Sequence, residues 1–289
     1  MFKNFFADFF AGKLLKWLIG SCGTAVALFL LGKNAFGLSV FRSVLLGIAV
    51  LTFLILLSFI RYLIVNTNRT SAYGEAIIML KNGFAGINLL KRNDTNNSEE
   101  IMSVLVEMCD TLKLVFDRLL RVDCSVSIKL PTRNEPISNN TIVENVCRDE
   151  SHYIVRTTEV YKNQVHRVTG NTAYNVILEN VLNGDRNNFY YLNNNVLKTR
   201  DYLTTSRPAY PNGLPYKSEL VYPILPLYPT EGQRSEAGKH QYEIWGFLCI
   251  DCNHINKFNS RYHVAIIEGV ADGVFDVIMK INRSKPSNN

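Results

Sequence analysis

Charged side chains are scarce in the first 65 residues and absent from residues 43–60. This uncharged stretch reads SVLLGIAVLTFLILLSFI and lies between Arg42 and Arg61. A helix of this length rises about 27 Å, which is close to the hydrocarbon thickness of a bilayer. The missing charge therefore predicts a transmembrane helix and argues against a chain that is soluble throughout.

A second apolar segment, residues 14–32, precedes it and contains Lys16 near one end. A lysine close to a helix end can extend to the membrane interface, so the segment also qualifies as a span. We therefore expect residues 1–65 to form a two-helix transmembrane hairpin with spans at about 14–32 and 43–60. A cleaved signal peptide is the alternative. The five phenylalanines before residue 11 and the second span favour the hairpin, with an interfacial helix at 2–13.

Lysine and arginine are unevenly distributed around these spans. The connector holds only Lys33 and Arg42, whereas both outer flanks hold three basic residues each. The positive-inside rule then places both termini in the cytoplasm and predicts a multi-pass protein of the inner (cytoplasmic) membrane of a bacterium. The bilayer is the first expected partner, and a reducing compartment agrees with unpaired cysteines.

Several features of catalytic and nucleic-acid-binding proteins are missing. The formal net charge is +6, but no run of five lysines or arginines occurs, so no nucleic-acid partner is expected. The sequence has no His-Glu-x-x-His pair, Walker loop or Gly-x-Ser-x-Gly elbow. Cys249 and Cys252 form a Cys-x-x-Cys pair without a second ligand pair, and strand alternation would turn them to opposite faces. We expect neither a metal site nor an enzyme.

The rest of the chain alternates apolar and polar segments as a soluble domain does. Residues 66–98 are expected to form a juxtamembrane helix and linker, with the helical pattern over 71–91, and residues 99–289 a sensory domain. Three helices are expected: one capped by Ser98 and ending near Arg121, one at 171–182, and one from Asn259 or Ser260 to 281. Four strands are expected at 122–130, 153–160, 219–227 and 242–251. A polar loop at 131–145 separates the first two strands, and a covering segment spans 190–229. This order predicts an α+β fold with a mainly antiparallel sheet flanked by helices.

A family resemblance follows from five segments in order. They are Asn171-Thr-Ala-Tyr-Asn-Val-Ile-Leu, Tyr190-Tyr-Leu, Ser206-Arg-Pro, Ser218-Glu-Leu-Val-Tyr-Pro-Ile and Trp245-Gly-Phe-Leu-Cys-Ile-Asp251. Together with the terminal helix they make residues 99–282 resemble a GAF domain. The resemblance implies a pocket covered by residues 171–229, in which family members bind cyclic nucleotides or tetrapyrroles; other members only dimerise.

The resemblance does not identify a cofactor. Tetrapyrrole-attaching members need a cysteine in the covering segment, and residues 171–229 contain none, so no covalent bilin is expected. Cyclic-nucleotide binders often carry Asn-Lys-x-Phe-Asp-Glu. This chain has Asn256-Lys257-Phe258 followed by Asn259-Ser260-Arg261, which lacks the acids. A small molecule or nucleotide remains the expected ligand, and its identity is unknown.

Six residues are the candidate ligand-binding set. They are Arg200, Tyr202, Arg207, Tyr210, Tyr216 and Asp251. Aromatic faces and guanidinium groups suit a planar or phosphorylated ligand. The alternative is that the tyrosines pack a proline-stiffened loop onto the sheet and that Asp251 caps a turn.

Three functions remain open. The first is a membrane-anchored cytoplasmic sensor. It would couple ligand binding to its membrane helices or to self-association, as a homo-oligomer held together by helices, and it would have no output domain in cis. The second is a membrane-perturbing effector of a bacterial defence system gated by a nucleotide. The third is a thiol-dependent GAF-like reductase that uses Cys109, Cys124 and Cys147. A passive dimerisation scaffold is a further possibility.

Overall fold

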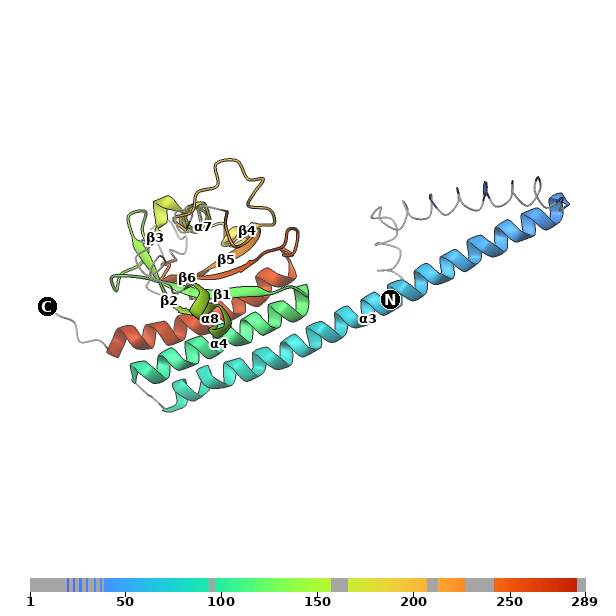
Figure 1. Cartoon of the computed structure of the whole chain (residues 1–289). Coiled ribbons are helices and arrows are strands. Elements are labelled where there is room, and N and C mark those ends of the chain that lie inside the picture. The colour runs from blue at the N-terminus through green and yellow to red at the C-terminus, as the bar shows by residue number, and fades with distance from the viewer. Residues whose placement is uncertain are drawn as a thin grey trace. The chain divides into compact units, whose positions relative to one another are not determined.

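A computed structural model describes residues 40–93, 97–156, 166–206, 213–226 and 242–284, with isolated positions between 20 and 39 (Figure 1). The chain divides into two compact units, Met1–Tyr73 and Gly74–Asn289. The expected first span at 14–32 lies outside the described residues except for a few isolated positions, and so does the expected interfacial helix at 2–13.

One long helix, α3 (Val40–Asn93), contains the expected span at 43–60 and begins in the first unit. Its most apolar window has a mean hydropathy of 2.7, and none of that window is buried. Large apolar side chains are exposed around it; Phe41, for example, is 71% exposed. Among the described residues, α3 is the one helix that is long and apolar enough to cross a membrane.

Two polar side chains within this apolar stretch, those of Thr52 and Ser58, are satisfied inside the helix. The hydroxyl of Thr52 donates to the carbonyl of Ile48, and that of Ser58 donates to the carbonyl of Leu54, each at 2.9 Å. Such bonds to the preceding turn remove the need for water at these side chains. The local chemistry is therefore compatible with a lipid environment.

The second unit has an α+β fold built on an antiparallel sheet (Figure 1). Its six strands, among the described residues, follow the order β3-β2-β1-β6-β5-β4. They are β1 (Cys124–Pro131), β2 (Ile142–Arg148), β3 (His166–Arg167), β4 (Tyr191–Asn193), β5 (Ser218–Ile224) and β6 (Gly246–Cys252). Every neighbouring pair is antiparallel, as the sequence predicted.

Helices α4 (Ser98–Leu120) and α8 (Tyr262–Ser284) cover one face of this sheet. Alternate strand residues such as Val126, Ile128 and Leu248 point toward them and are at most 1% exposed. Period-two alternation places the intervening residues on the other face. The helix face is therefore the apolar core, and the other face is left for polar side chains.

Residues 74–93, the end of α3, belong to this core. Ile87 and Leu90 are 1% and 2% exposed, and the ammonium of Lys280 on α8 donates to the carbonyl of Leu90 at 2.7 Å. Gly83 faces Thr111 of α4 so closely that a Cβ there would lie 2.8 Å from the Thr111 methyl. This part of α3 is thus packed into the second unit.

Two sequence predictions in the β1–α5 region are wrong. The predicted strand at 153–160 is replaced over its first part by α5 (Glu150–Arg156), because the buried Asp149 carboxylate accepts the backbone amide of His152 at 3.1 Å and supports a helical turn. The predicted polar loop at 131–145 contains the start of β2. Apolar and polar residues do not alternate regularly along β2, because its pairing with β1 includes a bulge.

The cap of α4 also differs from the prediction by one residue. Asn97, and not Ser98, accepts the amide of Glu99 on its side-chain oxygen at 3.0 Å. The other predicted helices and strands are confirmed within a few residues. They are α4, β1, α7 (Thr172–Leu182), β5, β6 and α8.

Candidate functional site

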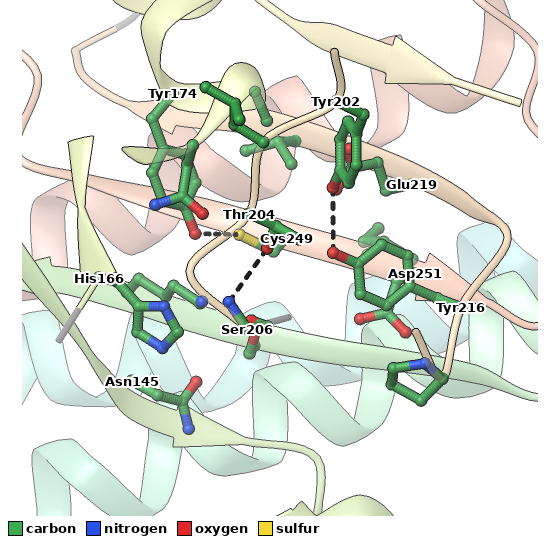
Figure 2. A pocket seen from close by; sticks show the side chains of 18 of the residues that line it. Asn145, His166, Tyr174, Tyr202, Thr204, Ser206, Tyr216, Glu219, Cys249 and Asp251 are labelled. Carbon is green, nitrogen blue, oxygen red and sulfur yellow. Dashed lines mark hydrogen bonds between the residues drawn. The ribbon is translucent and has the colours of Figure 1, made fainter. Parts of the chain in front are cut away.

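The sheet face opposite α4 and α8 carries an unusual number of polar side chains. Strand register aligns Ser127 of β1 with Cys249 of β6 and, one row along, Ser125 with Asp251. Helix α7 lies over this face, where the ring of Tyr174 stacks on Phe247 at a centroid distance of 4.3 Å. A cavity of about 100 Å³ lies between the sheet and its cover (Figure 2).

The cover of this cavity is held to the start of α7 by hydrogen bonds. The amide of Leu203 donates to the Thr172 hydroxyl at 2.8 Å, and the amide of Thr172 donates to the Leu203 carbonyl at 3.0 Å. The amide of Thr205 donates to the side-chain oxygen of Asn171 at 3.1 Å. Residues 202–206 are thereby positioned over the polar strand residues.

Basic side chains line the cavity toward β1 and β2. Lys129 and Arg148 are each 9% exposed. The ammonium of Lys129 lies 5.8 Å from the centroid of the Tyr174 ring, and it forms no ion pair within the described part of the chain. The guanidinium of Arg148 donates to the Ser125 hydroxyl at 2.7 Å. Two cations are thus buried at the wall of a small space, and the Arg148 guanidinium lies beside Ser125, the register partner of Asp251.

Burial and these cations shift the pKa values of groups in the cavity wall. Burial lowers the pKa of Lys129. Burial, reinforced by the charges of Lys129 and Arg148, lowers the pKa of His166 to about 3. His166 is therefore a neutral ring at physiological pH, and a ring nitrogen lies 2.7 Å from the Thr205 hydroxyl.

Acidic side chains line the cavity toward β5 and β6. Glu219 and Asp251 are direct register partners across these strands, an arrangement in which like charges repel. Glu219 is 7% exposed, and burial raises its pKa to about 7, helped by the charge of Asp251 and opposed by a hydrogen bond with Tyr202. The hydroxyls of Tyr202 and Tyr216 lie 3.0 Å apart beside it.

Two buried acceptor atoms of the cavity lack hydrogen-bond partners among the described residues. They are the side-chain oxygen of Asn145 and Oε1 of Glu219. An unsatisfied buried polar atom costs about 1–3 kcal/mol, so natural proteins rarely retain one without a reason. Figure 2 shows Asn145 and His166 on one side of the cavity and Glu219 with Asp251 on the other. The cavity therefore has unmet hydrogen-bonding capacity at both ends.

The structure brings three of the six sequence-predicted site residues together. Tyr202, Tyr216 and Asp251 line the cavity. Arg200 is exposed and does not line it. Arg207 and Tyr210 lie outside the described residues. Ligand binding by any of the six stays a prediction.

Sequence reasoning missed several polar residues of the cavity, among them Lys129, Asn145, Arg148 and Glu219. A charged residue inside a strongly apolar strand was the available signal for Lys129 and Glu219, because such residues are rarely buried without a partner. Asn145 and Arg148 were missed because β2 was not predicted as a strand.

The cysteines separate by sheet face. Cys249 lines the cavity, with its sulfur 4.0 Å from the Tyr174 hydroxyl, and burial raises its pKa to about 11. Cys109 and Cys147 lie on the helix face, with their sulfurs 3.8 Å apart, and Cys124 is also buried there. Among the described residues, no group of three or more histidine, cysteine, aspartate or glutamate side chains is placed to hold a metal ion.

No protein-family model and no curated protein match the chain. Solved structures do. The GAF domain of a phosphoenolpyruvate-protein phosphotransferase from Acinetobacter is 13% identical, covers 68% of this chain and 98% of its own, and has a TM-score of 0.40. The GAF region of a putative membrane protein from Geobacter sulfurreducens is 15% identical, with coverages of 58% and 93% and a TM-score of 0.32. A type II free methionine-R-sulfoxide reductase from Thermoplasma acidophilum is 12% identical, with coverages of 63% and 96% and a TM-score of 0.38. GAF domains recur among these structures, as the sequence resemblance predicted.

Proposed function

We propose that this chain is a membrane-anchored sensor whose second unit binds a small molecule in the cavity between the sheet and α7. The observation that carries the proposal is Oε1 of Glu219, a carboxylate oxygen buried without a hydrogen-bond partner among the described residues at the wall of a cavity. A ligand that donates to this atom recovers the free energy lost by burying it. Clustered polar groups with shifted pKa values in a concave site also favour a binding function.

Binding without catalysis fits the side chains of the cavity. Its cysteine, Cys249, has a raised pKa and is therefore a protonated, weakly nucleophilic thiol. The three thiols expected for a reductase, Cys109, Cys124 and Cys147, are not among the residues that line the cavity. These features support a sensor more than a thiol reductase.

The anchoring part of the proposal rests on α3. Its apolar window matches a bilayer in length and has no buried residue, while residues 74–93 of the same helix pack in the core of the second unit. We propose that the helix anchors the unit in the inner membrane as part of a two-helix hairpin, with both termini in the cytoplasm. Ligand binding then biases the packing of α3 against α4 and, through it, self-association of the membrane helices.

Fractionation of expressing cells tests the anchor. We expect the full chain to stay in the membrane pellet after an alkaline carbonate wash and to be released by detergent. Replacing Ile48 and Leu56 with arginine should reduce the fraction that resists the carbonate wash, because each charge at a helix centre costs about 2.5–3.5 kcal/mol of insertion free energy and leaves only the other span of the hairpin. Recovery of the wild-type chain in the soluble fraction without detergent would rule the anchor out.

A metabolite extract tests ligand binding independently of ligand class. The detergent-solubilised full chain is incubated with the extract, washed and denatured, and the released small molecules are identified by mass spectrometry. We expect a compound that is retained by the wild type and by Glu179→Gln, an exposed site on α7, but not by Glu219→Gln. Equal retention by all three proteins, or none by any, contradicts a binding function for this cavity.

A further inference from the structure

Two loops of the second unit meet at one end of the sheet. The first, residues 194–201, follows β4, and the second, residues 253–262, runs from β6 into the first residue of α8. The amide of Asn256 donates to the carbonyl of Asn194 at 2.8 Å, and the side-chain amide of Asn194 donates to the carbonyl of Phe258 at 2.9 Å. Figure 1 shows the second loop at the end of the unit where α4 joins β1. The two loops therefore form one continuous surface, the loop surface.

The loop surface carries an excess of positive charge. Its basic residues are Lys198, Arg200, Lys257 and Arg261, and its acidic residue is Asp201. Lys198, Arg200 and Arg261 are exposed, and none of the three forms an ion pair within the described ranges of the chain. Their charge is therefore not neutralised by the protein itself. Such a surface attracts an anionic partner.

Large apolar side chains are exposed beside these cations. Leu197 is 62% exposed, Ile255 is 45% exposed and Tyr262 is 44% exposed. The guanidinium of Arg261 lies 5.5 Å from the centroid of the Tyr262 ring, so a cation and an aromatic face are presented together. Basic residues alone would fit any polyanion. Leucine, isoleucine and tyrosine among them fit the boundary between lipid headgroups and acyl chains.

We propose that the loop surface docks on the anionic lipid headgroups of the membrane that holds α3. The basic side chains contact headgroup phosphates, and Leu197, Ile255 and Tyr262 enter the boundary between headgroups and acyl chains. This inference rests on the proposed function, because α3 is the membrane anchor there. It adds a second, reversible contact with the bilayer that depends on lipid charge.

The loop surface lies at the end of the second unit at which α3 enters that unit. Glu75 of α3 forms an ion pair with Arg118 in the last turn of α4 at 2.5 Å. The ammonium of Lys257 donates to the carbonyl of Leu120 at 3.4 Å, which places the second loop beside the same end of α4. Only residues 61–73 connect the apolar stretch to the second unit, and a helix of that length spans about 20 Å. A short tether raises the local concentration of lipid, so a surface of low intrinsic affinity can dock.

Hydrogen–deuterium exchange of the full chain in lipid nanodiscs tests the inference. One disc type contains phosphatidylcholine alone, and the other contains one-third phosphatidylglycerol, which is anionic. Each lysine or arginine near an anionic surface strengthens docking about fivefold, so exchange of residues 194–201 and 253–262 should slow about tenfold or more in the anionic discs. Raising the salt to about 1 M should remove this difference, because the Debye length falls to about 3 Å. Residues 132–140, between β1 and β2 at the opposite end of the sheet, should exchange equally in both disc types.

Matched variants assign the effect to the loop surface. Arg200→Gln combined with Arg261→Gln removes two of its charges and should weaken docking about twentyfold. Arg92→Gln combined with Arg133→Gln removes two exposed arginines outside the loop surface and should leave docking unchanged. Ile255→Ser should weaken docking without a change in charge, which a purely electrostatic contact would not show. Unaltered exchange of β6 confirms that each variant is folded.

The remaining outcomes separate this inference from the proposed anchor. Equal exchange of the loops in the two disc types overturns lipid docking and leaves the anchor standing, because α3 then holds the chain in the disc by itself. Slow exchange in both disc types that requires two chains in one disc assigns the loop surface to a second copy and also overturns the inference.

A chain that does not enter the discs overturns the anchor. Its flotation with anionic but not with neutral vesicles would then support the loop surface independently of α3. Flotation with neither kind of vesicle would overturn both.

Discussion

Glu219 on β5 and Asp251 on β6 are register partners that bring two carboxyl groups to the same wall of a cavity. Glu219 is almost fully buried, and burial raises its pKa to about 7. Like charges on cross-strand partners repel, so the charge of Asp251 adds to burial in opposing the ionisation of Glu219.

The first prediction concerns the pH dependence that Glu219 imposes. Its folded-state pKa is raised, so its contribution to stability is present below about pH 4.5 and is lost as the pH rises through 7. The loss is on the order of 3 kcal/mol for this shift. Denaturant unfolding of the detergent-solubilised chain between pH 5 and pH 8 should show it. Glu219→Gln should flatten this part of the profile, and an unchanged profile would contradict the burial of an ionisable carboxyl here.

The second prediction concerns His166, whose shift has the opposite sign. Its folded-state pKa is lowered to about 3, so its contribution to stability is present above about pH 6.5 and is lost as the pH falls toward 3. Side-chain NMR of labelled histidine should show a neutral ring at pH 5.5. His254, an exposed residue on the loop after β6, serves as the internal comparison. A protonated His166 at pH 5.5 would contradict its burial beside Lys129 and Arg148.

The third prediction concerns Asp149, which holds the start of α5. Burial alone would raise its pKa, but hydrogen bonds from His152 and the Val126 amide hold the pKa well below its ordinary value. Asp149→Asn should lower the free energy of unfolding by about 2–3 kcal/mol, because charge-assisted hydrogen bonds are lost. Glu150→Gln, an exposed neighbour, should change it by less than about 0.5 kcal/mol. Similar losses of unfolding free energy in the two variants would contradict a special role of Asp149 in stabilising α5.

The fourth prediction concerns the packing of α3 on α4 at Gly83. A Cβ at this position would lie 2.8 Å from the Thr111 methyl, so Gly83→Ala should destabilise the second unit by about 1–3 kcal/mol. The Gly83→Ala, Thr111→Ser double variant should recover much of that loss. Gly74→Ala is the control, because no atom lies within 4 Å of a Cβ there and alanine favours the helix. Equal effects at the two glycines would show that close helix contact does not matter.

Residues of the helices and of the central strands were predictable because their signals are local. The stripe of α4 has Leu105, Leu112 and Val115 fully buried, as its helical spacing indicates. The alternation of β6 correctly placed Cys249 and Cys252 on opposite faces. By contrast, residues 153–156 are helical because Asp149, which follows β2, accepts the amide of Val126 in β1, a contact that no local pattern shows.

The amino-acid sequence alone determined the long apolar stretch in α3, the helices α4, α7 and α8, and the faces to which the residues of the central strands point, since these depend on composition and on the periods of helix and strand. Only the tertiary structure decided which polar residues share the cavity. Glu219 and Asp251 are far apart in the chain, as are Lys129 and Arg148, and they become neighbours through strand register. Register is set by the packing of the whole sheet, and one polar residue in an apolar strand does not reveal its partner.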